Sequence, residues 1–418
     1  MDDINTKTFC GAPWFAIRTQ SNGSFAPCCE LNSNVSKFQG KKEYNVDVNT
    51  IEEWINSDYV TYIRQELKNG NKIAECDMCW KKEKNNIISL RKQINDTLTD
   101  NRGDEIKNTW IGSFLKKKDT QPMLLAADIK ISNLCNYSCV MCNPHDSSII
   151  FSKWQKEQEN LFVKEEIKKN KNYFEEIKKK NKKKYSHSIL LEILKHPIKH
   201  LKFLGGEPLL EKKLLTILSN IDETKKKNIA LHFVSNGSID ITKIIKKYNL
   251  NFKSVSVSIS LEGIEDMQDW ARKGSAWQTV KKNIFLAKKN GVQLSIHHTI
   301  QLSTIFRLNN LLNWCSKENL HITFGYLYKP TYLSIENLSN ELKQNIIDNL
   351  LINKLNFTKG IDSYYHENET SVENLITFLL EKFENKNKNQ IDKFYKFIEW
   401  YEKDSKLKLK NIVPELYK

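Results

Sequence analysis

The spacing of hydrophobic and polar positions changes near residue 123. Beyond that point, short apolar runs alternate with longer stretches in which apolar residues recur every three or four positions. The short runs are typical of strands, and the longer stretches are typical of amphipathic helices. Strands are predicted at residues 124–131, 200–204, 229–234, 254–259, 293–300 and 322–328. Helices are predicted between most of them, as at residues 212–221, 276–290 and 308–318.

Strands and helices that alternate in this way form a parallel sheet with right-handed crossovers. The six predicted units suit an open, partial (β/α)6 barrel over residues 123–338. Residues 339–418 are polar, show helical spacing and end in a run of aromatic side chains. An α/β fold with a helical C-terminal tail is therefore predicted.

The first hundred residues follow a different pattern. Two strands are predicted at residues 14–19 and 24–29, because the Asn22-Gly23 pair between them supplies the positive φ angles of a tight hairpin. Thr50 and Glu53 have the spacing of a capping box, and the helix that they begin is expected to end near Gly70. A small α+β domain is predicted at residues 1–100, followed by a linker at residues 101–122.

Composition and charge narrow the possible functions only slightly. With 418 residues, 39% of them hydrophobic, the chain is long enough for a large core and an accessory unit. The sequence contains neither a membrane-spanning apolar run nor an N-terminal signal segment, so a cytoplasmic protein without a membrane partner is expected. The net charge is +15, of which the lysine-rich residues 164–184 contribute +6. A solvated helical face explains that stretch, and an RNA-binding groove is the alternative.

The nine cysteines are unevenly distributed along the chain. Seven of them form three short groups: Cys10 with Cys28, Cys76 with Cys79, and Cys135 with Cys139 and Cys142. Cys29 and Cys315 are left over. Because disulfides are rare in a reducing compartment, this grouping indicates ligation of a metal or an iron–sulfur cluster.

The third group has the spacing CxxxCxxC and directly follows a predicted strand. Three thiolates hold three irons of a 4Fe–4S cubane and leave the fourth iron without a protein ligand. An open metal position is where chemistry takes place, as in catalytic zinc sites. A structural zinc site, which normally has two CxxC-type pairs, is the alternative reading of this motif.

Three further motifs follow the ends of predicted strands. They are Gly205-Gly206-Glu207-Pro208, Ser235-Asn236-Gly237 and Ser260-Leu261-Glu262-Gly263. The carboxyl-terminal ends of parallel strands are the face on which βα barrels build their sites. The sequence therefore predicts that these motifs lie together with the cysteine loop.

The cysteine spacing and the strand-end motifs resemble those of the radical S-adenosylmethionine (SAM) superfamily. The resemblance implies that SAM chelates the open iron and is cleaved to a 5′-deoxyadenosyl radical, which abstracts a substrate hydrogen atom. It also implies that Glu207 binds the SAM amino group, that Arg272 clamps the carboxylate and that Met141 packs beside the adenine. Ser260 would contact the ribose or the carboxylate, and Glu262 replaces the aspartate usual in that motif. The full set of cofactor-binding residues implied in this way is Met141, Gly205, Gly206, Glu207, Ser235, Asn236, Ser260, Glu262 and Arg272.

The N-terminal cysteines are similar to a second known module. Cys10, Gly23 and Cys28 have the spacing C-x12-G-x4-C, which resembles the opening of the SPASM and twitch domains. The resemblance implies a second, auxiliary 4Fe–4S cluster held by Cys10, Cys28, Cys76 and Cys79. The module departs from the usual pattern because it precedes the barrel, and Cys29 competes with Cys28 as a ligand. A four-cysteine zinc knuckle remains the alternative.

The resemblance to these families implies a radical SAM enzyme that modifies a peptide or a protein, with its oxidoreductase class left open. It implies an electron donor such as a flavodoxin or ferredoxin. Modification of RNA or a nucleotide is the first alternative. A non-enzymatic zinc protein that binds nucleic acid is an alternative of another class.

Overall fold

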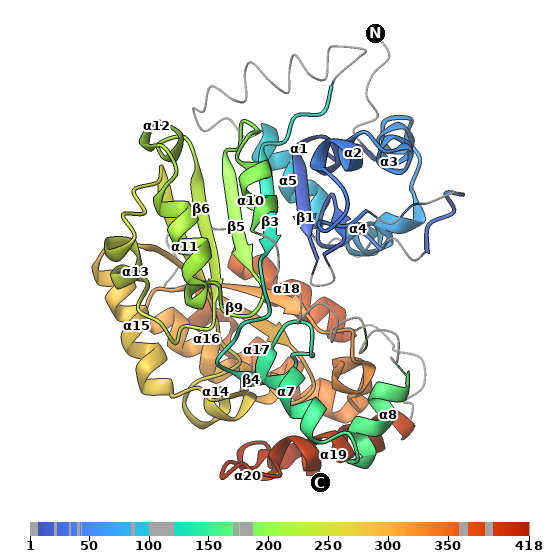
Figure 1. The fold of residues 1–418 in the computed structure, drawn as a ribbon. Coiled ribbons are helices and arrows are strands. Elements are labelled where there is room, and N and C mark those ends of the chain that lie inside the picture. Colours follow the sequence, from blue (N-terminus) through green and yellow to red (C-terminus); the bar gives the residue numbers. More distant parts are fainter. Residues whose placement is uncertain are drawn as a thin grey trace. The chain divides into compact units, whose positions relative to one another are not determined.

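The computed structural model describes residues 7–20, 23–32, 35–39, 42, 44–84, 88–99, 121–169, 175, 187–358, 367–380 and 388–417. The chain divides into two compact units. The first comprises Met1–Ile131, Tyr185–Phe203 and Lys227–Leu231, and the second comprises Ser132–Lys184, Leu204–Lys226 and His232–Lys418. Figure 1 follows the chain from blue at the N-terminus to red at the C-terminus.

The strands of the first unit lie in the order β2-β1-β3-β5. Strand β1 (Ala16–Thr19) pairs antiparallel with β2 (Phe25–Ala26) and parallel with β3 (Ala126–Lys130), and β5 spans His200–Leu204. The predicted hairpin is confirmed by the pairing of β1 with β2, although residues 21–22 of its turn lie outside the described residues. Its first strand begins later than predicted because Ala12–Phe15 form the short helix α1, which has a proline in its first turn.

The helix predicted after Thr50 is divided in two. Thr50 and Glu53 form the expected capping box at the start of α2 (Ile51–Ile55), since each side chain accepts a hydrogen bond from the other residue's backbone N–H. Ser57 then caps α3 (Asp58–Lys68), so the predicted single helix is wrong at this break. Further helices of this unit are α4 (Asp77–Lys84), α5 (Leu90–Thr99) and α10 (Ser188–Ile193).

The second unit contains the later strands of the alternating pattern, which can be followed in Figure 1. Parallel pairing joins β7 to β9 and β9 to β10. The strands are β6 (Ala230–Ser235), β7 (Ser254–Ser260), β9 (Gln293–Ile300) and β10 (His321–Tyr326). The helices between them are α11 (Lys212–Ser219), α12 (Glu223–Lys226), α13 (Ile241–Lys247), α14 (Glu265–Ala271), α15 (Trp277–Lys289) and α16 (Leu308–Lys317).

These elements confirm the predicted α/β class with a mostly parallel sheet. The side chains of β7 show why the pattern gives a strand: Val257 and Ile259 are buried, whereas Ser256 and Ser258 lie on the other face. On that face, Ser256 and Ser258 form hydrogen bonds with His232 of β6.

The C-terminal part is helical, as predicted. Its helices are α17 (Asn340–Thr358), α18 (Glu367–Leu380), α19 (Lys388–Glu402) and α20 (Leu409–Ile412). The connection after Cys142 adds α7 (Ser148–Lys156) and α8 (Leu161–Lys169). Within the described part of the chain, every helix is too short or too polar to cross a membrane.

Candidate functional site

The CxxxCxxC motif forms a loop of the second unit in which the three thiols lie close enough to influence one another. Burial raises the pKa of Cys135 to about 11, and the charge of Cys139 adds to this effect. A hydrogen bond between the Cys139 and Cys142 side chains lowers the pKa of Cys139 and raises that of Cys142. The structure therefore brings the three predicted cluster ligands together.

The donor set suits an iron–sulfur cluster. In a cubane each thiolate binds a different iron, so the ligands surround a volume rather than a point. Among the described residues, no three His, Cys, Asp or Glu side chains are placed to hold a single metal ion.

A short two-stranded ladder fixes the cysteine loop. Strand β4 (Ser138–Cys139) pairs antiparallel with β8 (Arg272–Lys273), and Cys139 lies directly opposite Arg272. The backbone N–H of Val140 extends this ladder with a hydrogen bond to the carbonyl of Ala271 at 2.8 Å. The backbone register therefore places the Arg272 side chain beside the cysteine thiols.

The Arg272 guanidinium is buried between an acid and a thiol. Its Nη2 donates to Glu262 Oε1 at 2.7 Å, and its Nη1 donates to Cys139 Sγ at 3.6 Å. Burial alone would lower the pKa of Arg272, but the charges of Cys139 and Glu262 raise it above its ordinary value. The predicted residues Glu262 and Arg272 are therefore part of the same site as Cys139.

Glu262 is itself fixed from the neighbouring strand and helix. Its side chain is 0% exposed, and Oε2 accepts a hydrogen bond from the Thr299 N–H at 3.2 Å. The Nδ1 atom of the buried His298 lies 3.6 Å from Oε2. The Glu262 N–H donates to the side chain of Gln268 at 2.8 Å. His298 and Gln268 were not among the predicted site residues, because nothing in the local sequence pairs them with Glu262.

Glu207 lies in a second buried polar group. Its carboxylate accepts hydrogen bonds from the Asn236 N–H at 2.7 Å, the Leu209 N–H at 3.1 Å and the Ser235 hydroxyl at 3.1 Å. Burial raises the pKa of Glu207 to about 7, although these donors oppose the shift. Asn236 Nδ2 also lies 3.9 Å from Cys135 Sγ, which links this predicted group to the cysteine loop.

Gly206, the second glycine of the Gly205-Gly206-Glu207 motif, allows its turn to contact the cysteine loop. A Cβ atom on Gly206 would lie 2.2 Å from the carbonyl oxygen of Leu134, the residue before Cys135. The Gly206 N–H instead donates to the Ser132 carbonyl, and the Glu207 N–H donates to that of Leu134. The absence of a side chain at Gly206 therefore lets this turn lie directly against the cysteine loop.

The remaining predicted residues are at the expected strand ends. Ser260 is buried at the end of β7, and Met141 is half-buried beside Cys142. Gly205 has a φ of 130°, which an L side chain rarely adopts.

Tyr401 of α19 was not predicted to belong to the site. Its hydroxyl donates to the Ser138 carbonyl at 2.9 Å or to the Trp270 carbonyl at 3.0 Å, and it accepts from the Lys273 N–H at 3.4 Å. It therefore bridges both strands of the β4–β8 ladder. The aromatic run in the sequence predicted a packing face but gave no sign of this polar contact.

Cys10, Cys28, Cys76 and Cys79 gather in the first unit. The charges of Cys10, Cys29 and Cys76 all act on Cys28, and the charge of Cys10 acts on Cys76 and Cys79. Burial is the main cause that raises the pKa of each thiol, to about 11 for Cys10 and about 12 for Cys79. Neighbouring thiols whose ionisation is disfavoured in this way are stabilised when a metal or cluster takes their negative charge.

Cys28 and Cys29 have different surroundings. Cys28 is half-buried and packs against the hydrophobic cluster that contains Cys10. Cys29 is exposed, and the charges that act on its thiol are those of Arg18, Glu30 and other polar residues rather than those of the other cysteines. Cys29 still acts on Cys28 through its charge, but of the two only Cys28 packs against the cluster that contains Cys10.

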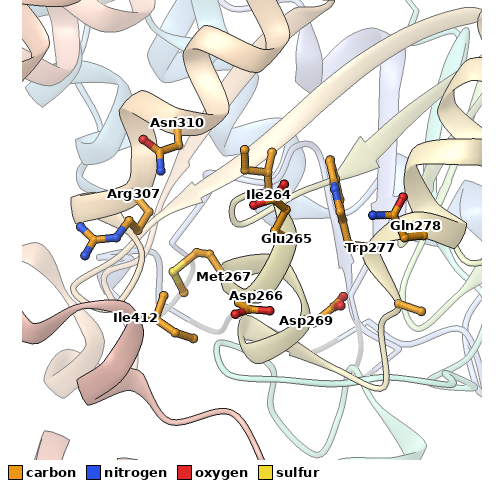
Figure 2. A pocket seen from close by; sticks show the side chains of 11 residues that line it. Ile264, Glu265, Asp266, Met267, Asp269, Trp277, Gln278, Arg307, Asn310 and Ile412 are labelled. Carbon is orange, nitrogen blue, oxygen red and sulfur yellow. The ribbon is translucent and has the colours of Figure 1, made fainter.

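A separate pocket of about 530 Å³ lies along α14 in the second unit (Figure 2). Acidic side chains of Glu265, Asp266 and Asp269 line it together with Trp277 and Arg307. None of the predicted cluster or cofactor residues lines this pocket.

One unsatisfied donor at the cysteine loop suits an anionic group of a cofactor. Arg272 Nε is buried and has no hydrogen-bond partner among the described residues. A SAM carboxylate would supply an acceptor for it, and Glu207 offers a carboxylate to the SAM ammonium. The residues present therefore fit SAM beside a cluster.

Comparison with known proteins agrees with this geometry. Residues 129–303 match the family model of the Radical SAM superfamily. The chain is similar to that superfamily over this segment, which contains the cysteine loop, Glu207 and Arg272.

The relatives are distant. The chain is 28% identical over 129 residues to a protein of Methanococcus aeolicus named "Probable GTP 3',8-cyclase". The aligned residues make up 30% of this chain and 42% of that protein. The solved structure "Native anSMEcpe with bound AdoMet" is 19% identical and covers 57% of this chain and 64% of its own, with a TM-score of 0.37. "Structure of TYW1 with a lysine-pyruvate adduct bound" is 15% identical and covers 55% and 71%, with a TM-score of 0.29. The chain thus spans less than half the length of the curated relative that it matches.

Proposed function

We propose that this chain cleaves SAM at a 4Fe–4S cluster held by Cys135, Cys139 and Cys142, and that it modifies a peptide or a protein. The observation that carries this proposal is the gathering of the three thiols beside Arg272, whose buried Nε lacks an acceptor. When bound and reduced, the cluster supplies the electron that converts SAM to methionine and a 5′-deoxyadenosyl radical.

The residues around the loop bind and orient SAM in this proposal. Glu207 attracts the ammonium group, and Arg272 donates to the carboxylate through Nε. Met141 packs beside the adenine, and Ser260 contacts the ribose or the carboxylate. Gly205 and Gly206 let the backbone approach the cofactor, while Ser235 and Asn236 hold the Glu207 carboxylate in place.

SAM affinity should depend on pH through Glu207. Only the ionised carboxylate attracts the ammonium, and burial raises the pKa of this group to about 7. As pH falls through that value the carboxylate takes up a proton, so SAM should bind less tightly, by roughly tenfold per pH unit well below the pKa. Measured SAM dissociation constants between pH 5.5 and 8.5 test this.

The variant Glu207→Gln is the control for that measurement. It should bind SAM weakly at every pH, because an amide cannot ionise. A wild-type affinity that stays flat across the range would contradict the assignment of Glu207 to the ammonium group.

We further propose that Cys10, Cys28, Cys76 and Cys79 hold an auxiliary 4Fe–4S cluster, as in twitch or SPASM modules. Four protein thiolates leave no iron open, so electron transfer is its expected role, with a flavodoxin or ferredoxin as donor. Its support is the electrostatic influence of Cys10 on the other three thiols. A zinc knuckle would give a colourless unit that contains zinc instead of iron.

Cys28→Ala and Cys29→Ala form a matched pair of neighbouring substitutions. Cys28→Ala should remove the auxiliary cluster, and so half of about eight irons per chain, because Cys28 packs against the cluster that contains Cys10 and is influenced by the charges of Cys10 and Cys76. Cys29→Ala should keep all of the iron, because Cys29 is exposed and none of the other three cysteines acts on its thiol. Iron and sulfide analysis of anaerobically reconstituted protein measures both.

The double variant Cys76→Ala/Cys79→Ala completes the test. It should lose the auxiliary cluster and still cleave SAM to 5′-deoxyadenosine. Equal iron loss in the Cys29→Ala and Cys28→Ala variants would overturn the ligand assignment, and zinc in place of iron would overturn the cluster.

A nucleotide is the second candidate substrate, because the curated relative is named a GTP 3′,8-cyclase. Incubation of the enzyme with deuterated candidate peptides, or with deuterated GTP, distinguishes the two. The true substrate transfers deuterium to 5′-deoxyadenosine, which mass spectrometry detects. Transfer from GTP alone would replace the peptide proposal.

A further inference from the structure

The pair Arg272–Glu262 suggests a second role beside the binding of SAM. Resting on the proposed cluster at Cys135, Cys139 and Cys142, we infer that Arg272 raises the reduction potential of that cluster through Cys139 and that Glu262 limits this effect. In this second role, separate from its contact with SAM, Arg272 acts through a ligand sulfur.

The geometry places the guanidinium on the sulfur independently of SAM. Arg272 and Cys139 are direct partners in the β4–β8 ladder, so the backbone fixes their separation. Nη1 lies 3.6 Å from Cys139 Sγ, whereas Nη2 is held by Glu262 at 2.7 Å. The Nε that remains is the donor that suits a SAM carboxylate. The guanidinium can therefore contact the ligand sulfur and SAM with different nitrogens.

The anchor of this arrangement is rigid. Glu262 is held by the backbone N–H of Thr299 on β9 and is fully buried. Rotation of the Arg272 side chain away from Cys139 would leave a buried carboxylate without its ion-pair partner, which is costly. We therefore expect the guanidinium to keep its contact with Cys139 Sγ in both oxidation states of a cluster.

The electrostatic consequence has a definite sign. Reduction adds an electron and makes the cluster and its sulfur ligands more negative. A cationic donor to a ligand sulfur stabilises that state and raises the potential, whereas a nearby carboxylate destabilises it. Little solvent screens these charges, because both side chains are buried.

The experiment compares Arg272→Gln with Glu262→Gln in the full chain without SAM. Each variant keeps an amide that can form hydrogen bonds and removes one charge. Arg272→Gln should lower the potential by at least the equivalent of a tenfold change in the ratio of reduced to oxidised cluster, about 59 mV for a one-electron couple. Glu262→Gln should raise the potential, and the double variant should return toward the wild-type value. The potential is measured by redox titration followed by electron paramagnetic resonance. The signal of the cluster in question is the one that the Cys135→Ala/Cys139→Ala/Cys142→Ala variant lacks.

Arg307→Gln is the matched control, because it breaks another Arg–Glu pair of the same unit, with Glu415 at 2.8 Å. It should leave the potential unchanged. If the substitutions only destabilised the protein, the reduction potentials of both test variants would shift in the same direction. That result would overturn the inference, and so would an unchanged potential in both variants. If Arg272→Gln does not fold, the sign of the Glu262→Gln shift still decides. If the wild-type protein gave no electron paramagnetic resonance signal of a 4Fe–4S cluster, the proposed function itself would be contradicted.

Discussion

Replacing Cys135, Cys139 and Cys142 with alanine should abolish the production of 5′-deoxyadenosine and remove half of about eight irons per chain. The reason is that no other cysteine lies in this loop, so the variant would retain only the proposed auxiliary cluster. Iron analysis and chromatography of SAM cleavage products under strict anaerobiosis measure the two effects.

Cys315→Ala serves as the control for the triple variant. This thiol is buried on α16, and burial alone raises its pKa. Its removal should leave iron content and SAM cleavage unchanged. Should the triple variant still cleave SAM, the catalytic cluster would have to lie elsewhere.

Gly206→Ala should lower the rate of SAM cleavage at least tenfold and destabilise the protein by roughly 1–3 kcal/mol, as overpacking generally does. The added methyl would lie 2.2 Å from a backbone oxygen of Leu134, so the turn or the cysteine loop has to move. Cleavage assays and denaturant unfolding, monitored by circular dichroism, measure these effects.

A substitution at Gly291 distinguishes the effect of a steric clash from the effect of backbone strain. Gly291 has a φ of 70°, but a Cβ there would meet nothing within 4 Å. Gly291→Ala should therefore cost some stability and leave SAM cleavage intact. Equal loss of cleavage in both variants would mean that the contact with Leu134 is not what matters at Gly206.

The alternating part of the fold could be predicted because each strand carries its own local signal. Strands β5 and β9 begin and end at the predicted residues, and the helices between the strands differ from prediction only at their ends. Each βα unit is specified by neighbouring residues, and the parallel arrangement follows from the connections. The break at Ser57 was missed because a capping serine inside a helical pattern resembles any exposed polar position.

Sequence analysis could predict those site residues whose position follows from the ends of the strands. Glu207, Asn236 and Arg272 were expected near the cysteine loop and lie there. The partners of Glu262 could not be inferred, because His298 is brought to it by the register between two strands rather than by a motif. Tyr401 was missed for a similar reason, since its contacts are made with backbone carbonyls, which have no sequence signature.

The contact of Tyr401 with Ser138 joins residues 263 positions apart. During synthesis the ribosome releases the cysteine loop long before it makes α19, so the nascent loop lacks this brace for most of translation. Assembly factors that deliver iron and sulfide would therefore encounter a fully supported loop only once the last helices have docked. Maturation of this centre is thus expected to be a post-translational event.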